Sequence, residues 1–225
     1  MEIPTLNTPV TKCLALATFA GQMLSKYAAT NAVLLELATK MFGARDKLAT
    51  AEQAHEAAEA NVLPMRVNVR FADHESDECI KQRKRAAQLA DGETEGPYVL
   101  HLFPNGTTPL TRPVGAAQIK EMRALEGRYD ALLDRWPDAM AEKNIVTTLR
   151  QRYEQSLAER AAAEQTVIDT KAARDLAKED FLDVYAEIAN RIRSLFPRNK
   201  PKQDLFFDAV TNRVRSENDT NEAVA

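Results

Sequence analysis

The amino-acid sequence predicts an all-α protein, an elongated antiparallel helical bundle or coiled coil built on two long helices with two or three shorter ones. The 225 residues include 36 alanines and only 7 glycines, and alanine together with Glu, Lys, Arg and Leu is typical of long helices. Two segments, 10–63 and 138–196, contain no proline, and both carry apolar residues three or four apart. We expect a single domain over residues 1–215 and a disordered tail over 216–225.

The first long helix is expected over residues 10–62. Between residues 10 and 44 its charged residues are three lysines and one glutamate, so apolar side chains surround this part of the helix. A helix that is apolar all round must be buried on most sides. We therefore expect a second copy to cover it in a homodimer or a higher assembly. The expected self-association residues are Leu16, Met23, Tyr27, Leu34, Leu37, Met41, Phe206 and Phe207.

The middle of the chain is expected to be less regular. Pro64 should end the first long helix, and apolar and polar residues alternate over 65–71, which is typical of a strand. A short helix is expected over 73–90, with Asp73 as its N-cap. Residues 91–115 contain several glycines and prolines, and they predict an irregular loop or a small hairpin.

The second half of the chain predicts three helices. Apolar residues three or four apart indicate a helix over 116–136. Pro137 can begin the next helix at its first turn, and that second long helix is expected to continue over 138–196. Two prolines follow it, and a last short helix is expected over 204–214.

The sequence shows no recognisable catalytic motif. It contains no glycine-rich phosphate loop, no dinucleotide-binding motif and no nucleophile elbow. Glu52 and His55 have the E-x-x-H spacing of di-metal helical bundles, but a second such motif is missing. Cys13 and Cys79 form no metal-binding or disulfide pattern. We therefore predict a protein that is not an enzyme and that uses no cofactor and no metal.

Two basic clusters support an alternative function, the binding of a polyanion such as a nucleic acid or an anionic surface. The net charge of −3 at pH 7 argues against a general nucleic-acid binder, so nucleic acid is the less expected partner. The clusters consist of Lys81, Arg83, Lys84 and Arg85 in the first, and of Arg191, Arg193, Arg198, Lys200 and Lys202 in the second.

The sequence also predicts a cytoplasmic protein without membrane insertion. Polar residues interrupt its most apolar stretch, so no clean run of about 20 apolar residues occurs, and the sequence begins without the basic residues of a signal peptide. Together these features favour a self-associating helical scaffold, assembly or adaptor protein that acts through protein–protein surfaces.

Overall fold

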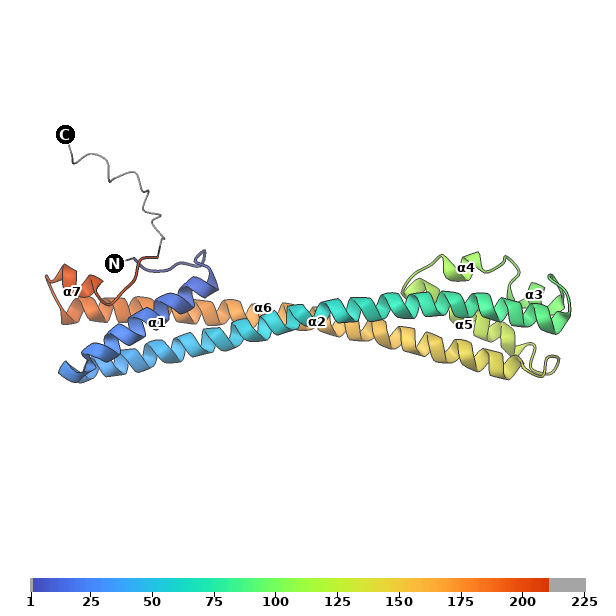
Figure 1. Ribbon diagram of the computed structural model, residues 1–225, viewed down its shortest axis with the longest axis horizontal. Coiled ribbons are helices and arrows are strands. Elements are labelled where there is room, and N and C mark those ends of the chain that lie inside the picture. The colour runs from blue at the N-terminus through green and yellow to red at the C-terminus, as the bar shows by residue number, and fades with distance from the viewer. Residues whose placement is uncertain (1, 211–225) are drawn as a thin grey trace, which may run out of the picture. The chain divides into compact units, whose positions relative to one another are not determined.

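The computed structural model describes residues 2–210, and this part of the chain contains helices and no strand. The all-α prediction is therefore confirmed (Figure 1). The elements are α1 (Val10–Tyr27), the 3-10 helix η1 (Ala28–Thr30), α2 (Ala32–Asp91), α3 (Pro97–Leu102), α4 (Thr108–Thr111), α5 (Ala116–Asp130), α6 (Ala139–Leu195) and α7 (Lys200–Asp204).

Contacts divide the chain into two compact units. Unit 1 comprises Met1–Glu56 with Asp169–Ala225, and unit 2 comprises Ala57–Ile168. The two long helices α2 and α6 each contribute to both units. Because both helices are shared, the prediction of a single domain stays a prediction.

In unit 1 the expected helix over residues 10–62 is wrong, because the chain turns at η1 and α1 folds back along α2 (Figure 1). Asn31 precedes α2 in an extended conformation, and its side-chain oxygen accepts a hydrogen bond from the N–H of Val33 at 3.0 Å. The two helices approach closely at Gly21, where a Cβ atom would lie 2.6 Å from the ring of Phe42. The apolar circumference of this segment is thus covered largely by its own chain.

The core of unit 1 lies between α1, α2 and α6. Two ion pairs join α2 to α6: Lys40 Nζ lies 2.6 Å from Glu187, and Glu52 lies 3.8 Å from Arg174. The later residue on α2 thus pairs with the earlier residue on α6. The two helices are therefore antiparallel in this unit. The buried side chains of this core include Cys13, Leu16, Leu24, Leu34, Met41, Leu48, Phe181, Tyr185, Ile188, Ile192, Phe206 and Phe207.

The expected helix over 204–214 is wrong in the described part of the chain. Helix α7 ends at Asp204 instead, and residues 207–210 form no helix. Asn199 caps α7 by accepting a hydrogen bond from the N–H of Lys202 at 3.1 Å. Phe206 then enters the core and stacks on Phe196, with ring centroids 5.7 Å apart. Residues 211–214, and the tail expected over 216–225, lie outside the described residues.

In unit 2 three expectations about residues 62–90 are wrong, because α2 continues through Pro64 to Asp91. There is no helix end at Pro64, no strand over 65–71 and no separate helix over 73–90. A proline inside a helix costs about 3 kcal/mol, but the residues beyond it pack against α5 and α6. Val69 and Ala72 join Tyr153 in that contact, and such packing can offset the cost.

The segment 91–115 forms two short helices, α3 and α4, and not the hairpin considered from the sequence. Both oxygens of Asp91 accept hydrogen bonds from backbone N–H groups at the start of α3, from Tyr98 at 3.0 Å and from Val99 at 2.9 Å. Gly96 allows this approach, because a Cβ atom there would lie 2.4 Å from Asp91. The carboxylate of Asp91 thus caps the start of α3.

The main core of unit 2 lies between α2, α3, α5 and α6. Helices α5 and α6 begin and end within a few residues of the ranges expected from the sequence, except that α5 ends at Asp130 and turns follow it to 138. The buried residues of this core include Cys79, Ile80, Val99, Leu102, Phe103, Leu110, Met122, Leu125, Tyr129, Leu132, Trp136 and Val146.

Candidate functional site

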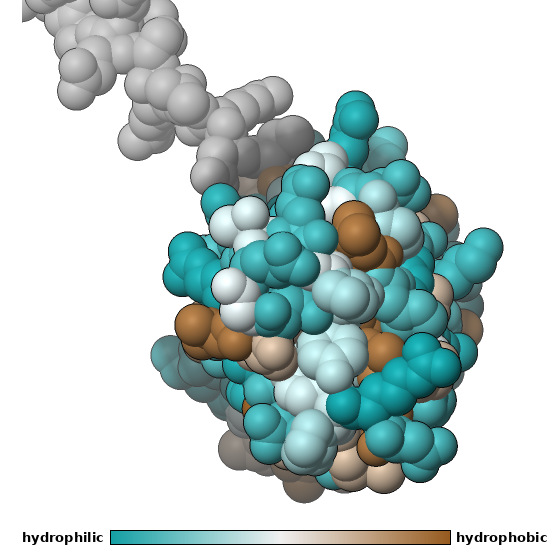
Figure 2. Space-filling view, turned by 90° about the vertical axis from the view of Figure 1, so that its right-hand side faces the viewer, coloured by the Kyte–Doolittle hydropathy of each residue, from teal (hydrophilic) through white to brown (hydrophobic). Residues whose placement is uncertain are grey.

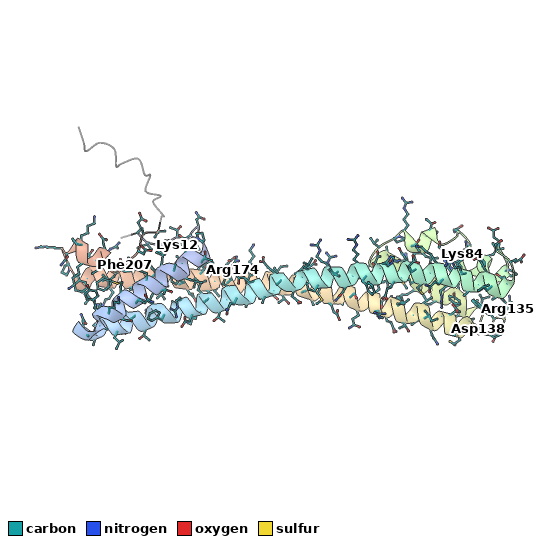
Figure 3. The ribbon with its side chains drawn as sticks, in the orientation of Figure 1. Lys12, Lys84, Arg135, Asp138, Arg174 and Phe207 are labelled. Carbon is teal, nitrogen blue, oxygen red and sulfur yellow. The ribbon has the colours of Figure 1, made fainter. Side chains whose placement is uncertain are left out.

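The residues expected to mediate self-association lie inside unit 1. Leu16, Leu34, Met41 and Phe206 are fully or almost fully buried, and Leu37 and Phe207 are buried as well. Met23 and Tyr27 are half-buried and pack against the same core. Figure 3 places Phe207 among the helices of this unit. We chose these residues because we expected their apolar surface to be uncovered. In the structure the chain's own α1, α2, α6 and residues 206–207 cover it.

A different apolar surface remains open on α2 in unit 2. Leu63, Val67 and Phe71 are exposed by 64%, 56% and 56%. They are spaced four residues apart, so they share one side of the helix. We call these three residues the outer stripe. Sequence reasoning missed it because the alternation over 65–71 suggested a strand, whereas the four-residue spacing was the helical signal.

The inner side of the same segment is covered. Met65 and Val69 are only partly exposed, and Ala72 and Ser76 are buried. Ser76 satisfies its hydroxyl within the helix by donating to the carbonyl of Ala72 at 2.7 Å. This stretch of α2 therefore carries apolar residues on two sides, and the described chain covers one of them.

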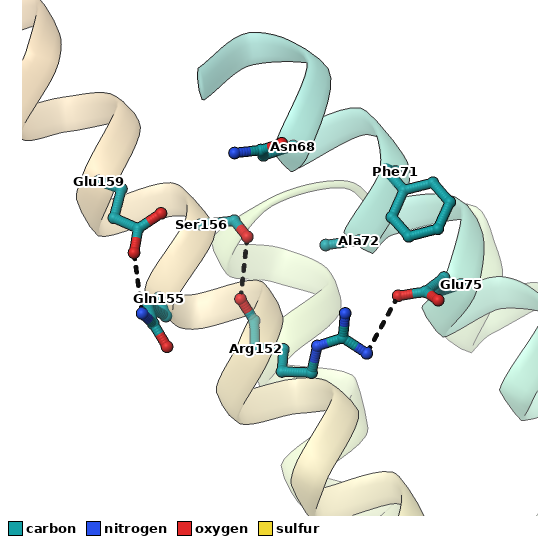
Figure 4. Close-up of a pocket in the computed structure, with 8 residues that line it drawn as sticks. All are labelled: Asn68, Phe71, Ala72, Glu75, Arg152, Gln155, Ser156 and Glu159. Atoms are coloured by element: carbon teal, nitrogen blue, oxygen red, sulfur yellow. Dashed lines mark hydrogen bonds and ion pairs between the residues drawn. The ribbon is translucent and has the colours of Figure 1, made fainter. Parts of the chain in front are cut away.

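A groove of about 250 Å³ lies between α2 and α6 beside the outer stripe (Figure 4). Its α2 side is formed by Asn68, Phe71, Ala72 and Glu75, and its α6 side by Arg152, Gln155, Ser156 and Glu159. Arg152 Nη1 lies 3.4 Å from Glu75 Oε2 across the groove, and Gln155 donates to Glu159 at 2.8 Å. These polar side chains pair with one another. The groove therefore presents no convergent set of polar groups that would bind a substrate or catalyse a reaction.

Charged residues flank the outer stripe in an ordered way. Glu59 precedes it, whereas Arg66 and Arg70 lie within its length. All three side chains are exposed, and helical geometry places them on the same flank of the stripe. The flank is thus acidic at its amino-terminal end and basic at its carboxyl-terminal end.

The structure does not bring the first basic cluster together. Lys81 pairs with Glu78 at 2.7 Å, and this contact lowers the pKa of Glu78 and raises that of Lys81. Arg83 points into unit 2 and lies 2.8 Å from Glu142, with both side chains largely buried. Burial raises the pKa of Glu142 despite this arginine. Arg85 is exposed, and Lys84, labelled in Figure 3, is half-buried, so only part of the cluster faces solvent.

The second basic cluster keeps its charges on the surface. Arg191, Arg193, Arg198 and Lys200 are exposed, and Lys202 is half-buried. Arg193 donates to the amide oxygen of Asn190 at 2.9 Å, and Lys202 lies over the ring of Phe196 at 4.4 Å. Within residues 2–210 none of these five side chains makes an ion pair with a carboxylate.

Glu52 and His55 are engaged with α6 in unit 1. Glu52 Oε2 lies 3.8 Å from Arg174 Nε, and His55 Nδ1 lies 3.3 Å from the hydroxyl of Thr170. In the described residues no three His, Cys, Asp or Glu side chains gather as metal ligands would. Both cysteines are buried thiols, and burial raises the pKa of each.

A wider hollow of about 590 Å³ lies where α3 meets the turn after α5. Its polar groups hold the fold together: Tyr98 donates to the carbonyl of Arg135 at 2.8 Å, His101 lies 3.1 Å from the carbonyl of Arg128, and Asp91 caps α3. Figure 2 looks onto this end of the molecule and shows mostly hydrophilic residues with separate apolar ones. We therefore assign a structural role to the polar groups of this hollow.

Comparison with protein-family models, with curated proteins and with solved structures finds no match for this chain. Among residues 2–210, no helix combines the length and the apolar character needed to cross a membrane.

Proposed function

We propose that the protein is a non-enzymatic helical scaffold that self-associates through the outer stripe of α2. The observation that carries the proposal is that Leu63, Val67 and Phe71 are each more than half exposed on one side of a helix. Monomers rarely leave contiguous large apolar side chains in water. Burying the exposed part of each of them on association would contribute about 1–2 kcal/mol.

The occupant that fits the outer stripe is a second copy of α2 running antiparallel. Consider a two-fold axis that passes just after Leu63. Val67 then lies opposite Ala60 of the second copy, and Phe71 lies opposite Glu56 and beside Ala57 of that copy. Both alanines are exposed, and their small side chains let the two helices approach closely. Val67 of one copy therefore meets a small residue of the other, and Phe71 packs beside a second one.

Charge favours the same arrangement. In an antiparallel pair, each flank of one helix faces the same flank of its copy. Glu59 then lies opposite position 68 of the second copy, between Arg66 and Arg70 of that copy, and the contact occurs twice by symmetry. Exposed ion pairs contribute on the order of 0.2–1 kcal/mol each. They therefore favour the antiparallel orientation of the two helices but add little to the affinity of the dimer. A parallel pair would set this flank against the opposite flank of the copy, and Glu59 would not meet these arginines.

The proposed interface is small, because one helix per chain supplies it. Interfaces that bury less than about 1,200 Å² belong to weak or transient complexes. We therefore expect a dimer whose population depends on protein concentration in the micromolar range.

Sedimentation velocity from about 5 to about 500 µM tests the proposal, since a Kd near 50 µM corresponds to about −6 kcal/mol. We expect the wild type to move from monomer to dimer over this range and Val67→Glu to remain monomeric. Leu89→Glu is the matched control, because Leu89 is 84% exposed on the same helix but outside the stripe; it should behave as wild type. A wild type that stays monomeric throughout overturns the proposal.

Charge reversal tests the orientation. Glu59→Arg should weaken the dimer, because it places a new positive charge on one copy near two arginines of the other. Adding Arg66→Glu and Arg70→Glu to the same chain should restore the dimer. A dimer that the single reversal leaves unchanged would contradict the antiparallel arrangement.

A further inference from the structure

Six cations gather at one end of unit 1. Tyr27 at the end of α1 contacts Phe206 at 5.4 Å between ring centroids, and Phe206 stacks on Phe196 after α6. These contacts bring the carboxyl-terminal end of α1 beside the turn between α6 and α7 (Figure 1). We call the exposed or half-exposed cations of this region the basic end: Lys26, Arg191, Arg193, Arg198, Lys200 and Lys202.

The basic end is not neutralised in the way that the first basic cluster is. Lys81 and Arg83 pair with Glu78 and Glu142, whereas the cations of the basic end make no ion pair within residues 2–210. Asp204 is the single acid among residues 191–204. The region therefore keeps a positive charge although the whole chain carries −3.

Arg198 occupies an unusual backbone conformation at the centre of this region. Its φ is 64°, and among the described residues it is the non-glycine residue with a positive φ. Holding such a residue there costs on the order of 1–3 kcal/mol, and strain of this kind tends to persist at functional sites. The turn is fixed from both sides, since Asn199 caps α7 and Gln203 donates to the carbonyl of Phe196 at 2.8 Å.

The surroundings favour a lipid surface over a nucleic acid. Proteins that bind single-stranded nucleic acids offer exposed aromatic rings for base stacking. Here the ring of Phe196 is occupied by Phe206 and by the ammonium of Lys202. Leu205, which follows α7 directly, is 43% exposed, and an exposed leucine beside lysines can enter the boundary between headgroups and acyl chains.

We propose that the basic end docks the protein on membranes that carry anionic phospholipid headgroups. The arginines and lysines contact the lipid phosphates and carboxylates, and Leu205 enters the interface. The protein stays peripheral in this arrangement. Acidic residues elsewhere oppose it weakly, because charges more than about 10 Å from the surface are screened at 0.1 M salt.

Co-sedimentation of the full chain with vesicles tests this proposal. The vesicles contain phosphatidylcholine with about 30% phosphatidylserine, or phosphatidylcholine alone. We expect binding to the anionic vesicles only, and its loss when salt rises from about 0.1 M to about 0.5 M. Binding to both kinds of vesicle alike, or to neither, would overturn the proposal.

Two matched triple variants locate the surface. Arg191→Gln with Arg198→Gln and Lys200→Gln removes three charges from the basic end. Each loss should lower the partition coefficient about fivefold, so the variant should bind about 100-fold more weakly. Lys81→Gln with Lys84→Gln and Arg85→Gln removes three charges from α2 and should bind within about twofold of wild type. Equal loss in both variants would show only general electrostatic attraction and would contradict the assignment.

A third variant and a second ligand separate lipid from nucleic acid. Leu205→Gln keeps every charge and should weaken vesicle binding about threefold or more, because it removes buried apolar area. A DNA duplex of about 20 base pairs should bind far more weakly than the anionic vesicles at the same salt. Tight duplex binding that the basic-end variant abolishes, with Leu205→Gln unchanged on vesicles, would assign the surface to nucleic acid instead.

Discussion

The hydroxyl of Tyr153 donates a hydrogen bond to Oδ1 of Asp73 at 2.8 Å and joins α6 to α2 inside unit 2. The same hydroxyl accepts a hydrogen bond from the backbone N–H of Gly115 at 2.7 Å, just before α5 begins. Tyr153 is almost completely buried. One phenol thus links three helices, and it fixes the segment of α2 that carries the outer stripe.

Tyr153→Phe should lower the free energy of unfolding by about 2 kcal/mol, because it leaves the N–H of Gly115 and the carboxylate of Asp73 without their partner. Urea denaturation of the two proteins measures this difference. Tyr98→Phe is the control, since the hydroxyl of Tyr98 makes its bond at an exposed site and its removal should cost less than about 1 kcal/mol. Equal effects of the two substitutions would contradict the assigned role of Tyr153.

Stability should fall steeply in alkaline solution. Burial raises the pKa of Tyr153 to about 12, and the hydrogen bond to Asp73 acts in the same direction. The folded pKa thus lies above the unfolded value of about 10. The stability that comes from the protonated phenol is therefore complete below about pH 10 and is lost as the pH rises toward 12. Urea denaturation at several pH values should show this loss in wild type and a smaller one in Tyr153→Phe.

The packing of α1 on α2 makes two glycines behave differently. Gly43→Ala should raise the free energy of unfolding by about 0.5–1 kcal/mol, because alanine favours a helix and no atom lies within 4 Å of the new Cβ. At Gly21 the same change places a Cβ 2.6 Å from the Phe42 ring and should give no gain or a loss. If α1 were not folded back on α2, both substitutions would stabilise the protein equally.

Neighbouring leucines on α2 distinguish core from surface. Leu34→Ala should destabilise the protein by about 2–5 kcal/mol, because Leu34 is almost fully buried in unit 1. Leu35→Ala should change stability by less than about 0.5 kcal/mol, because Leu35 is 57% exposed. Neither change should alter the assembly state. A loss of self-association in Leu34→Ala without loss of stability would restore the association surface first expected from the sequence.

The sequence predicted the fold class and the second long helix because the signals there were local. Prolines bracket the segment 138–196, and α6 occupies nearly all of it. The break between α1 and α2 was not predicted, because residues 10–62 keep one unbroken apolar spacing. That spacing serves equally for a helix covered by a second copy and for a helix that folds back on itself. Burial of the folded-back core decides between them, and it outweighs the small cost of the turn at Asn31.

At Pro64 the local signal was outweighed by packing. A proline disfavours a helix interior by about 3 kcal/mol, yet α2 continues through Pro64, and the residues beyond it, Val69 and Ala72, pack against α5 and α6. The apolar residues that alternate over 65–71 then lie on two sides of a helix. Val69 is on the side that packs against the protein, and Val67 is on the exposed side. The outer stripe could be found only once this segment was known to be helical. The basic end likewise could be identified only from the structure, because the fold decides which cations have no acidic partner.

Cysteine cross-linking tests the central claim most directly. Leu63→Cys places a thiol next to the proposed two-fold axis, so two copies should form an intermolecular disulfide under mild oxidation. The native cysteines are both buried and should not compete. Leu89→Cys exposes a thiol on the same helix away from the axis. The account predicts a covalent dimer for Leu63→Cys that Val67→Glu prevents, and little dimer for Leu89→Cys; equal cross-linking at both positions, or none at Leu63→Cys, would contradict it.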